Sequence, residues 1–304
     1  MMVIEEMQPD DRCRYTGSCV RSWLEARGSK KYIYALELIG NDKEDFDIRV
    51  VYNEKENEEE QQGYSLKIKK EDGKKCMIYS SIQNERQIWR IDYEDSIDVK
   101  ETVVEQFKTI LDLFQNTVKK LVIEDAHLEN YDFGIKSLRS LEILEIEDDK
   151  DITPLISKIR KPLKDLRHWG KFNSECFEQL CEVQNRLYTP YLELNNQQFL
   201  QLSAESISIQ IGELTENDVA NFINKWRNGK IDDNFKSCSW HLDTSYFNVG
   251  KLYRILGVEY KGSQLEKTEI RHNKEEGKIA YLQHFYCKYA SILSFRVDSS
   301  EKRE

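Results

Sequence analysis

Glycine and proline are both scarce in this chain of 304 residues, with 13 and 4 copies. A collagen-like or low-complexity protein needs far more of both, so these classes are excluded. No apolar run approaches the roughly 18 residues that a membrane-spanning helix needs. The stretch from Met1 to Arg14 is polar and acidic, and so differs from a secretory signal. Hydrophobic residues make up 39% of the chain, which is enough to bury a core.

An excess of positive charge is also missing. Lys and Arg number 45 against 55 Asp and Glu, which gives a net charge of -10. Nucleic-acid binding depends on a basic stripe that displaces counterions from phosphates. The short basic pairs, such as Lys69-Lys70, are interleaved with acidic residues. We therefore expect neither a nucleic-acid partner nor a membrane partner.

Recognisable reaction motifs are absent as well. The chain has no phosphate-binding loop, no G-x-S-x-G elbow and no H-E-x-x-H zinc motif. Its five histidines show no i, i+4 pair. We expect a non-enzymatic protein without catalytic residues, metal or cofactor. The alternative is a hydrolase-type or other enzyme whose site is assembled across the sheet, because catalytic triads form from distant segments.

The seven cysteines are odd in number, scattered, and without a C-x-x-C spacing. This usage is typical of reduced thiols in the cytoplasm or nucleus rather than of a disulfide framework. A run of acidic residues, Glu147, Asp148, Asp149 and Asp151, offers carboxylates of the kind that bind magnesium. We interpret it as a solvated loop at the end of a strand.

Residues 31–95 predict an antiparallel, β-rich segment. Apolar and polar residues alternate from Phe46 to Val50 and from Tyr64 to Lys69, as in strands with one solvated face. Asp72-Gly73 is a strong hairpin signal. We expect about five strands here.

The period changes at Asp98. The Asp98-x-x-Glu101 spacing resembles a capping box, in which the Asp98 carboxylate accepts the backbone N–H three residues on. Apolar residues then recur at three- and four-residue spacing from Val103 to Val118. This stripe predicts an amphipathic helix of about 20 residues.

Short strands then alternate with short helical segments. The strands centre on Val122, Leu144, Leu166, Leu192, Ile209 and Trp240. No single unit buries its own apolar face, so stacking of neighbours is expected. The overall prediction is an α/β fold with an α+β N-terminal part. It is an antiparallel segment followed by an irregular leucine-rich-repeat-like stack of helix–strand units with a parallel sheet.

The last third predicts one well-capped helix and a closing region. Thr215 is the expected N-cap, and Gly229 stands where a left-handed C-terminal cap is needed. A short helix near 248–256, closing strands near 266–271 and 278–283, and an amphipathic tail near 286–295 follow. The predicted organisation is a short N-terminal segment (1–30), the β-rich segment (31–95), the helix–strand repeat domain (96–297) and a disordered tail (298–304).

The segment from Leu214 to Gly229 resembles the nematode F-box-associated family, type 2. Asn221, Phe222, Trp226 and Gly229 match the Asn-x-Phe-[Ile/Leu]-x-x-Trp-x-x-Gly pattern of that family. The resemblance extends over about residues 96–245, and loosely over 31–95. It implies the substrate-recognition region of an F-box protein, which is the receptor of an SCF-type ubiquitin ligase.

The family pattern also includes an N-terminal F-box of about 40 residues with an early Leu-Pro. Here only about 30 residues precede the first expected strand, and they contain no Leu-Pro. The stretch from Ser18 to Ala26 is similar to the last helix of an F-box alone. The resemblance therefore implies a receptor that recruits a Skp-type adaptor and cullin only if an F-box is supplied. Otherwise it is a ligase-free binding protein, for instance a decoy that competes for substrates.

The expected partner is a protein held on the open face of the stacked sheet. If the apolar strand positions point into the core, alternation directs the polar positions to the opposite face. We expect partner contacts from Glu145, Arg167, Glu193, Gln210 and His241. Ordinary solvated strand residues are the alternative interpretation of all five. The Phe222 and Trp226 stripe is expected to be core.

Overall fold

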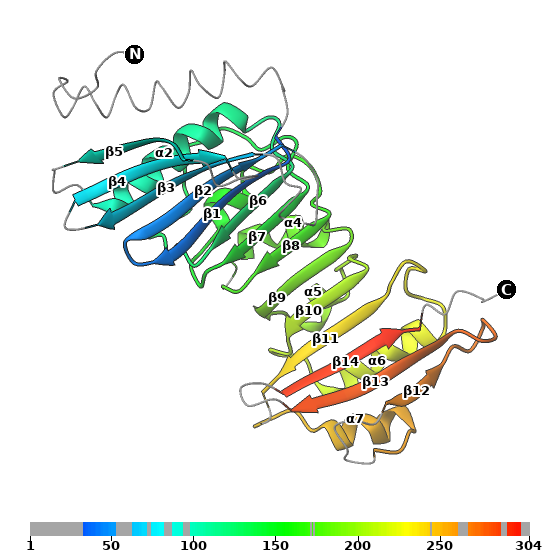
Figure 1. The fold of residues 1–304 in the computed structure, drawn as a ribbon. Helices are drawn as coiled ribbons and strands as arrows, with labels where there is room; N and C mark the ends of the chain where they lie inside the picture. Colours follow the sequence, from blue (N-terminus) through cyan, green and yellow to red (C-terminus); the bar gives the residue numbers. More distant parts are fainter. Residues whose placement is uncertain are drawn as a thin grey trace. The chain divides into compact units, whose positions relative to one another are not determined.

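The computed structural model describes residues 33–52, 63–71, 74–81, 87–93, 98–170, 172, 174–243, 245–260, 267–286 and 291–298. They form a mixed α/β protein built on a large β-sheet with few helices (Figure 1). The chain divides into two compact units between Lys161 and Pro162. The predictions for residues 1–30 and for the tail beyond Asp298 lie outside the described residues.

In the first unit, strands lie side by side in the order β7-β6-β1-β2-β3-β4-β5. Neighbours from β1 to β5 pair antiparallel. β6 pairs parallel with both β1 and β7. The elements are β1 (Ala35–Asp42), β2 (Asp45–Val51), β3 (Gly63–Glu71), β4 (Lys74–Ser81), β5 (Gln87–Tyr93), α2 (Val99–Phe114), β6 (Lys120–Glu124), β7 (Ile143–Glu147) and α3 (Thr153–Ile156).

The compact units differ from the expected ranges, which separated 31–95 from 96–297. Backbone pairing brings Leu36 of β1 opposite Leu121 of β6. Helix α2 packs on β2 and β3. Because hydrogen bonds and apolar contacts both cross position 95, the β-rich segment, α2, β6 and β7 belong to one unit.

Helix α2 begins as expected and ends earlier. Asp98 is its N-cap, but the carboxylate accepts the backbone N–H of Lys100 at 2.9 Å, two residues on rather than three. Val103, Phe107 and Leu111 form its buried stripe. The helix ends at Phe114 instead of reaching the predicted Val118, which is buried in the connection to β6.

In the second unit, strands lie in the order β12-β13-β14-β11-β10-β9-β8. β8, β9, β10 and β11 pair parallel, and β14, β13 and β12 continue antiparallel. The elements are β8 (Asp165–His168), η3 (Ser174–Cys176), α4 (Phe177–Cys181), β9 (Arg186–Glu193), α5 (Asn196–Phe199), β10 (Ser206–Gln210), α6 (Glu216–Arg227), β11 (Ser237–Leu242), α7 (Val249–Leu256), β12 (Thr268–Arg271), β13 (Ile279–Tyr286) and β14 (Ser291–Val297).

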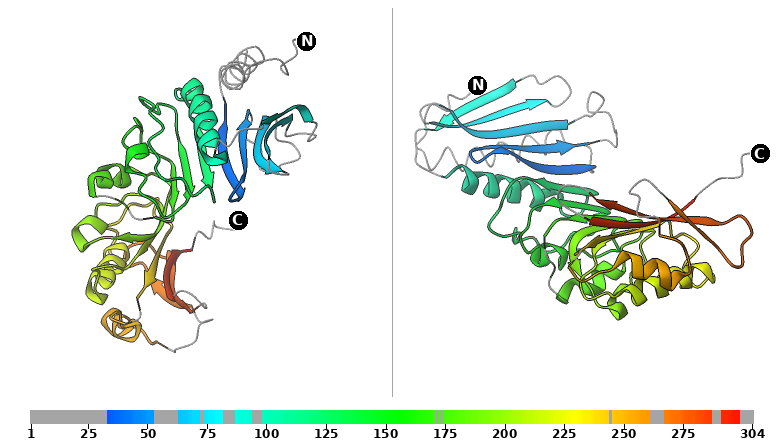
Figure 2. Two further views of the ribbon diagram at one scale, coloured as in Figure 1. Left: turned by 90° about the vertical axis from the view of Figure 1, so that its left-hand side faces the viewer. Right: turned by 90° about the horizontal axis from the view of Figure 1, so that it is seen from below.

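The six strands expected from their apolar centres all have counterparts, from β6 to β11. The amphipathic tail predicted near 286–295 is wrong. Its alternation belongs to β14, which lies between β11 and β13. In both views of Figure 2, α6 and α7 lie on one side of the strands of this unit. The opposite side of these strands is left without a described helix.

Helix α6 is capped as its sequence predicts. The Thr215 side chain accepts the Asp218 backbone N–H, and the Asp218 carboxylate accepts the Thr215 backbone N–H at 2.9 Å. Gly229 has a φ of 62°, the left-handed region in which a side chain strains the backbone. Both helix ends are therefore determined by local chemistry.

Aromatic side chains from α5, α6, β11 and β14 make the core of the second unit. Phe222 lies 4.9 Å from Phe199 and 5.9 Å from Trp240, measured between ring centroids. Trp226 lies 5.2 Å from Phe295 in an edge-on contact. The expectation that Phe222 and Trp226 are core residues is confirmed, since both are buried.

We expect Phe222→Ala to lower the free energy of unfolding by about 3–5 kcal/mol, because the substitution removes a ring from three aromatic contacts and leaves a cavity. Urea unfolding monitored by circular dichroism measures the change. Phe285→Ala is the matched control, since this residue is 40% exposed and its substitution should cost under about 1 kcal/mol. Equal losses from the two variants would contradict this account of the core.

Candidate functional site

The described residues contain no group of three or more His, Cys, Asp or Glu side chains that could hold a metal ion. The described cysteines Cys76, Cys176, Cys181 and Cys238 are all unbridged. Burial raises the pKa of Cys181 and of Cys238, so neither thiol is activated as a nucleophile. No helix among these residues is both long and apolar enough to cross a bilayer.

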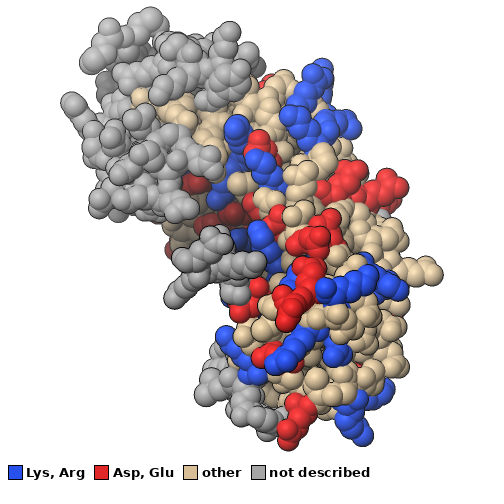
Figure 3. All heavy atoms as spheres, turned by 90° about the vertical axis from the view of Figure 1, so that its right-hand side faces the viewer, with Lys and Arg blue, Asp and Glu red and all other residues tan. Residues whose placement is uncertain are grey.

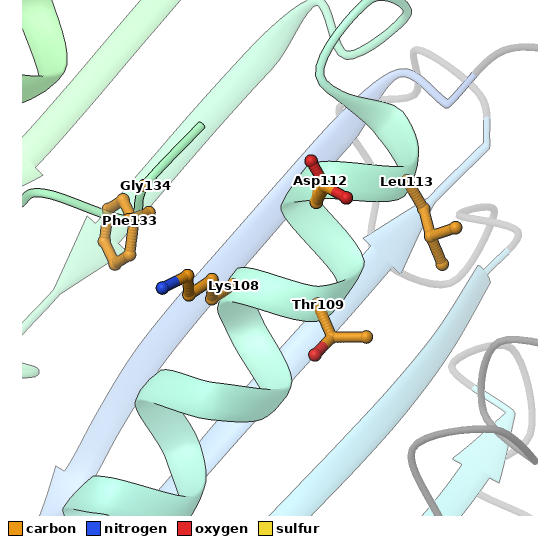
Figure 4. A pocket seen from close by; sticks show the side chains of 6 residues that line it. All are labelled: Lys108, Thr109, Asp112, Leu113, Phe133 and Gly134. Carbon is orange, nitrogen blue, oxygen red and sulfur yellow. The ribbon is translucent and has the colours of Figure 1, made fainter. Parts of the chain in front are cut away.

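One depression, with a volume of about 400 Å³, lies against α2 in the first unit. Figure 4 shows Lys108 directed toward Phe133 and Gly134, whereas Thr109 and Leu113 lie on another side of the helix. Asp112 accepts a hydrogen bond from Gln115 on the same helix at 2.9 Å. The lining residues therefore do not converge on a common point, and we assign no site there.

The acidic run at the end of β7 is solvated as predicted at Asp149 and Asp151, which are exposed, but not at Asp148. Asp148 is buried, and its carboxylate accepts a hydrogen bond of 2.7 Å from the Tyr131 hydroxyl. Burial and this carboxylate raise the pKa of Tyr131 well above its usual range. Asp151 accepts the backbone N–H of Thr153 at the start of α3. Both carboxylates serve the local fold rather than an ion.

The first of the predicted partner contacts, Glu145, lies on β7 in the first unit. Its carboxylate forms an ion pair with Lys120 at 3.1 Å. Lys120 also acts on nearby Glu37, whose pKa is raised by burial and lowered in part by Arg49 and Lys120. Glu145 thus belongs to a network of compensated charges on the strands of that unit.

The other four predicted residues lie on the uncovered side of the second unit. Backbone register places Gln210 of β10 opposite both Glu193 of β9 and His241 of β11. These three residues form one row across three strands. Arg167, on β8, lies in the next row, opposite Tyr188. The side chains of Arg167, Tyr188, Ser208 and His241 share this side of the sheet. We name it the open face.

An arginine–aromatic cluster occupies one part of the open face. The Arg167 guanidinium carbon lies 4.2 Å from the centre of the Trp169 ring and 5.6 Å from that of Tyr188. The Trp169 and Tyr188 rings are 5.2 Å apart. Arg167 is exposed, and Trp169 and Tyr188 are half-buried. Stacking holds the guanidinium on a platform of two rings.

Sequence reasoning placed Arg167 on this face and missed its two aromatic partners. Arg167 and Trp169 are two residues apart, so strand alternation was a signal that they share a side. Tyr188 had no such signal, because its proximity depends on the pairing of β8 with β9. His168, between Arg167 and Trp169, is fully buried and packs on Phe172 at 5.0 Å.

Ser208 and His241 make a polar contact beside this cluster. The Ser208 Oγ lies 3.1 Å from His241 Nε2. His241 also makes an edge-on contact with Tyr188, at 6.4 Å between ring centroids. Burial lowers the pKa of His241, so the neutral imidazole is favoured. On the surface seen in Figure 3, basic side chains lie among acidic ones rather than in one continuous stripe.

Comparison with protein-family models, with curated proteins and with solved structures found no match.

Two histidines make stability depend on pH. Burial lowers the pKa of His241 and of His284 below the ordinary value of about 6.5. Unfolding returns both pKa values to about 6.5. Below about pH 6.5 the unfolded state therefore binds more protons than the folded state, and the free energy of unfolding falls as the pH falls. We expect the urea midpoint to be steady above about pH 7 and to decrease from about pH 6.5 to 5.5.

The double variant His241→Gln/His284→Gln tests the source of this decrease. Glutamine does not titrate, so the fall in the urea midpoint between about pH 6.5 and 5.5 should become smaller than in the unmodified chain. An unchanged fall would assign the pH dependence to other groups.

Proposed function

We propose that the chain is a non-enzymatic protein-binding module that holds its partner on the open face of the second unit. The observation that carries this proposal is the cluster of Arg167, Trp169 and Tyr188. Arginine, tryptophan and tyrosine are the residue types that contribute most to binding energy at protein interfaces. Stacking orders the Arg167 side chain before binding, which reduces the entropy lost on association.

The arrangement of elements supports the predicted repeat-like stack. Each crossover between the parallel strands β8, β9, β10 and β11 contains a helical segment, namely η3 with α4, α5, and α6. Repeat proteins of this kind leave a broad strand surface for a macromolecular partner. Under this proposal, the second unit is an irregular leucine-rich-repeat-like stack closed by three antiparallel strands.

The receptor role is proposed from the family resemblance. Phe222 and Trp226 are buried, and Gly229 caps α6, so these matching residues maintain the fold rather than bind a partner. We propose that the open face captures the substrate protein of a ubiquitin ligase, with a Skp-type adaptor and cullin recruited only where an F-box is supplied. A ligase-free competitor for the same substrate would use the same face.

Affinity purification from lysate with quantitative mass spectrometry tests the binding face. We expect Arg167→Glu and Trp169→Ala each to reduce recovery of specific partners at least tenfold, because each removes part of the stacked cluster. Arg160→Glu, at an exposed position in the first unit, is the control and should leave recovery unchanged. Recovery that is insensitive to both cluster variants would refute the proposed face. Adaptor and cullin in the eluate would support ligase membership.

A hydrolase is the second candidate, because Ser208 and His241 are within hydrogen-bonding distance. Two requirements of acyl transfer lack support in the described residues. No carboxylate there hydrogen bonds to His241, although catalytic histidines are usually oriented by one. Ser208 also lies in the middle of β10, which is paired on both sides, so its backbone offers no spare N–H donors for an oxyanion.

We expect a fluorophosphonate probe to leave Ser208 unmodified, since the hydroxyl lacks an oxyanion site beside it. Intact-mass analysis after incubation measures labelling, and Ser208→Ala is the control. Stoichiometric labelling that disappears in Ser208→Ala would favour the hydrolase over the binding module.

A further inference from the structure

Two arginines on the open face lie in one register row. Arg186 of β9 is opposite Ser206 of β10, Ser206 is opposite Ser237 of β11, and Ser237 is opposite Arg296 of β14. From β9 to β14 the row therefore reads Arg-Ser-Ser-Arg. It continues to Asp165 of β8, opposite Arg186, and to Tyr281 of β13, opposite Arg296. Three spacings of about 4.8 Å separate the two arginine backbones by roughly 14 Å.

The surroundings of this row leave both arginines accessible. Arg186 and Arg296 are exposed, while their strand neighbours Leu187 and Phe295 are buried on the helix side. Neither guanidinium has a hydrogen bond or an ion pair with another described residue. Asp165 lies opposite Arg186 and partly compensates its charge, whereas the register neighbours of Arg296, Ser237 and Tyr281, are uncharged.

The floor between the arginines is made of small hydroxyl side chains. Ser208, Ser239 and Ser294 form a second row of serines beside Ser206 and Ser237. Ser239 Oγ donates to Ser294 Oγ at 3.5 Å. Serine hydroxyls can donate and accept hydrogen bonds, so the floor can meet a peptide backbone without steric obstruction.

The strand positions of this area carry a small positive excess, although the whole chain is acidic. On β8, β9, β10, β11 and β14 the open face carries Arg167, Arg186 and Arg296 against Asp165 and Glu193. The chain as a whole has a net charge of -10. An excess of one positive charge makes this area more complementary to an acidic partner than the rest of the acidic chain.

We propose that the open face binds an extended, acidic segment of a partner protein. The proposal rests on the protein-binding function above and specifies its ligand. Carboxylates of the segment pair with Arg186 and Arg296, and the serines hydrogen bond to the backbone between them. At about 3.3 Å per residue, the 14 Å between the arginines matches acidic residues about four positions apart. Single-stranded nucleic acid fits less well, because it carries a phosphate at every nucleotide and cannot avoid Asp165 and Glu193, whereas a peptide can place uncharged residues beside them.

Peptide selection on the chain of 304 residues provides the test. A library of random 12-residue peptides is selected on the immobilised protein, and enriched peptides are resynthesised with a fluorophore for polarisation measurements. We expect enrichment of Asp and Glu at four-residue spacing, and at least tenfold weaker binding when these residues are replaced by amides. The double variant Arg186→Gln/Arg296→Gln should lose at least tenfold in affinity, with unchanged circular dichroism.

The double variant Arg139→Gln/Arg160→Gln is the control, because it removes the same charge from exposed positions of the first unit. Its affinity should stay within about twofold of the unmodified chain. Equal losses in the two double variants would show a general charge effect and overturn the proposal. Tighter binding of a labelled 12-nucleotide single strand than of any peptide would overturn it as well.

The remaining outcomes separate this inference from the function on which it rests. Enriched peptides that lack acidic residues, yet lose affinity with Trp169→Ala, would refute the acidic ligand and leave the binding module standing. A selection that enriches no peptide, or peptides insensitive to Trp169→Ala, would count against both.

Discussion

The second unit depends on side-chain alternation along strands that pair in register. In β10 and β11, Ile207 pairs with Cys238 and Ile209 with Trp240, and all four side chains are buried. The intervening positions, Ser208 and Ser239, also pair with each other and must face the opposite way. A shift of one residue in this pairing would bury serines and expose Trp240, so the apolar core also determines which residues form the open face.

Local patterns explain how much of the fold could be predicted. The strands from β6 to β11 and helix α6 carry their own signals, which are apolar runs, a capping box and a glycine at the C-terminal end. The segment of β14 alternates too. Whether it forms a tail or a strand depends on its pairing with β13 and with β11, and β11 lies more than 45 residues earlier in the chain. The buried hydrogen bond between Tyr131 and Asp148 could not be predicted either, because acidic runs are usually solvated and Tyr131 is distant in the sequence.

The candidate site shows the same division between local and long-range information. Alternation was enough to direct Arg167, Gln210 and His241 away from the core, and pairing brings Glu193, Gln210 and His241 into one row. Glu145 belongs to the first unit, where it is paired with Lys120. Tyr188, Arg186 and Arg296 escaped notice because their significance comes from neighbours on other strands. From a single sequence, the side of the sheet to which a strand residue points is easier to predict than its neighbour on the next strand.

Under the proposed function, the composition of the open face separates two tasks of binding. The stacked side chains of Arg167, Trp169 and Tyr188 would supply contact area and desolvation, which account for most of the affinity at interfaces. The serines lose little side-chain entropy when a ligand orders them. Their small side chains also leave the space between the two arginines open to a ligand. Because charge separation along a row is set by the number of intervening strands, inserting or deleting one strand unit would change the ligand spacing by about 4.8 Å. Selectivity for partners would then follow from strand count, while affinity would follow from the aromatic cluster.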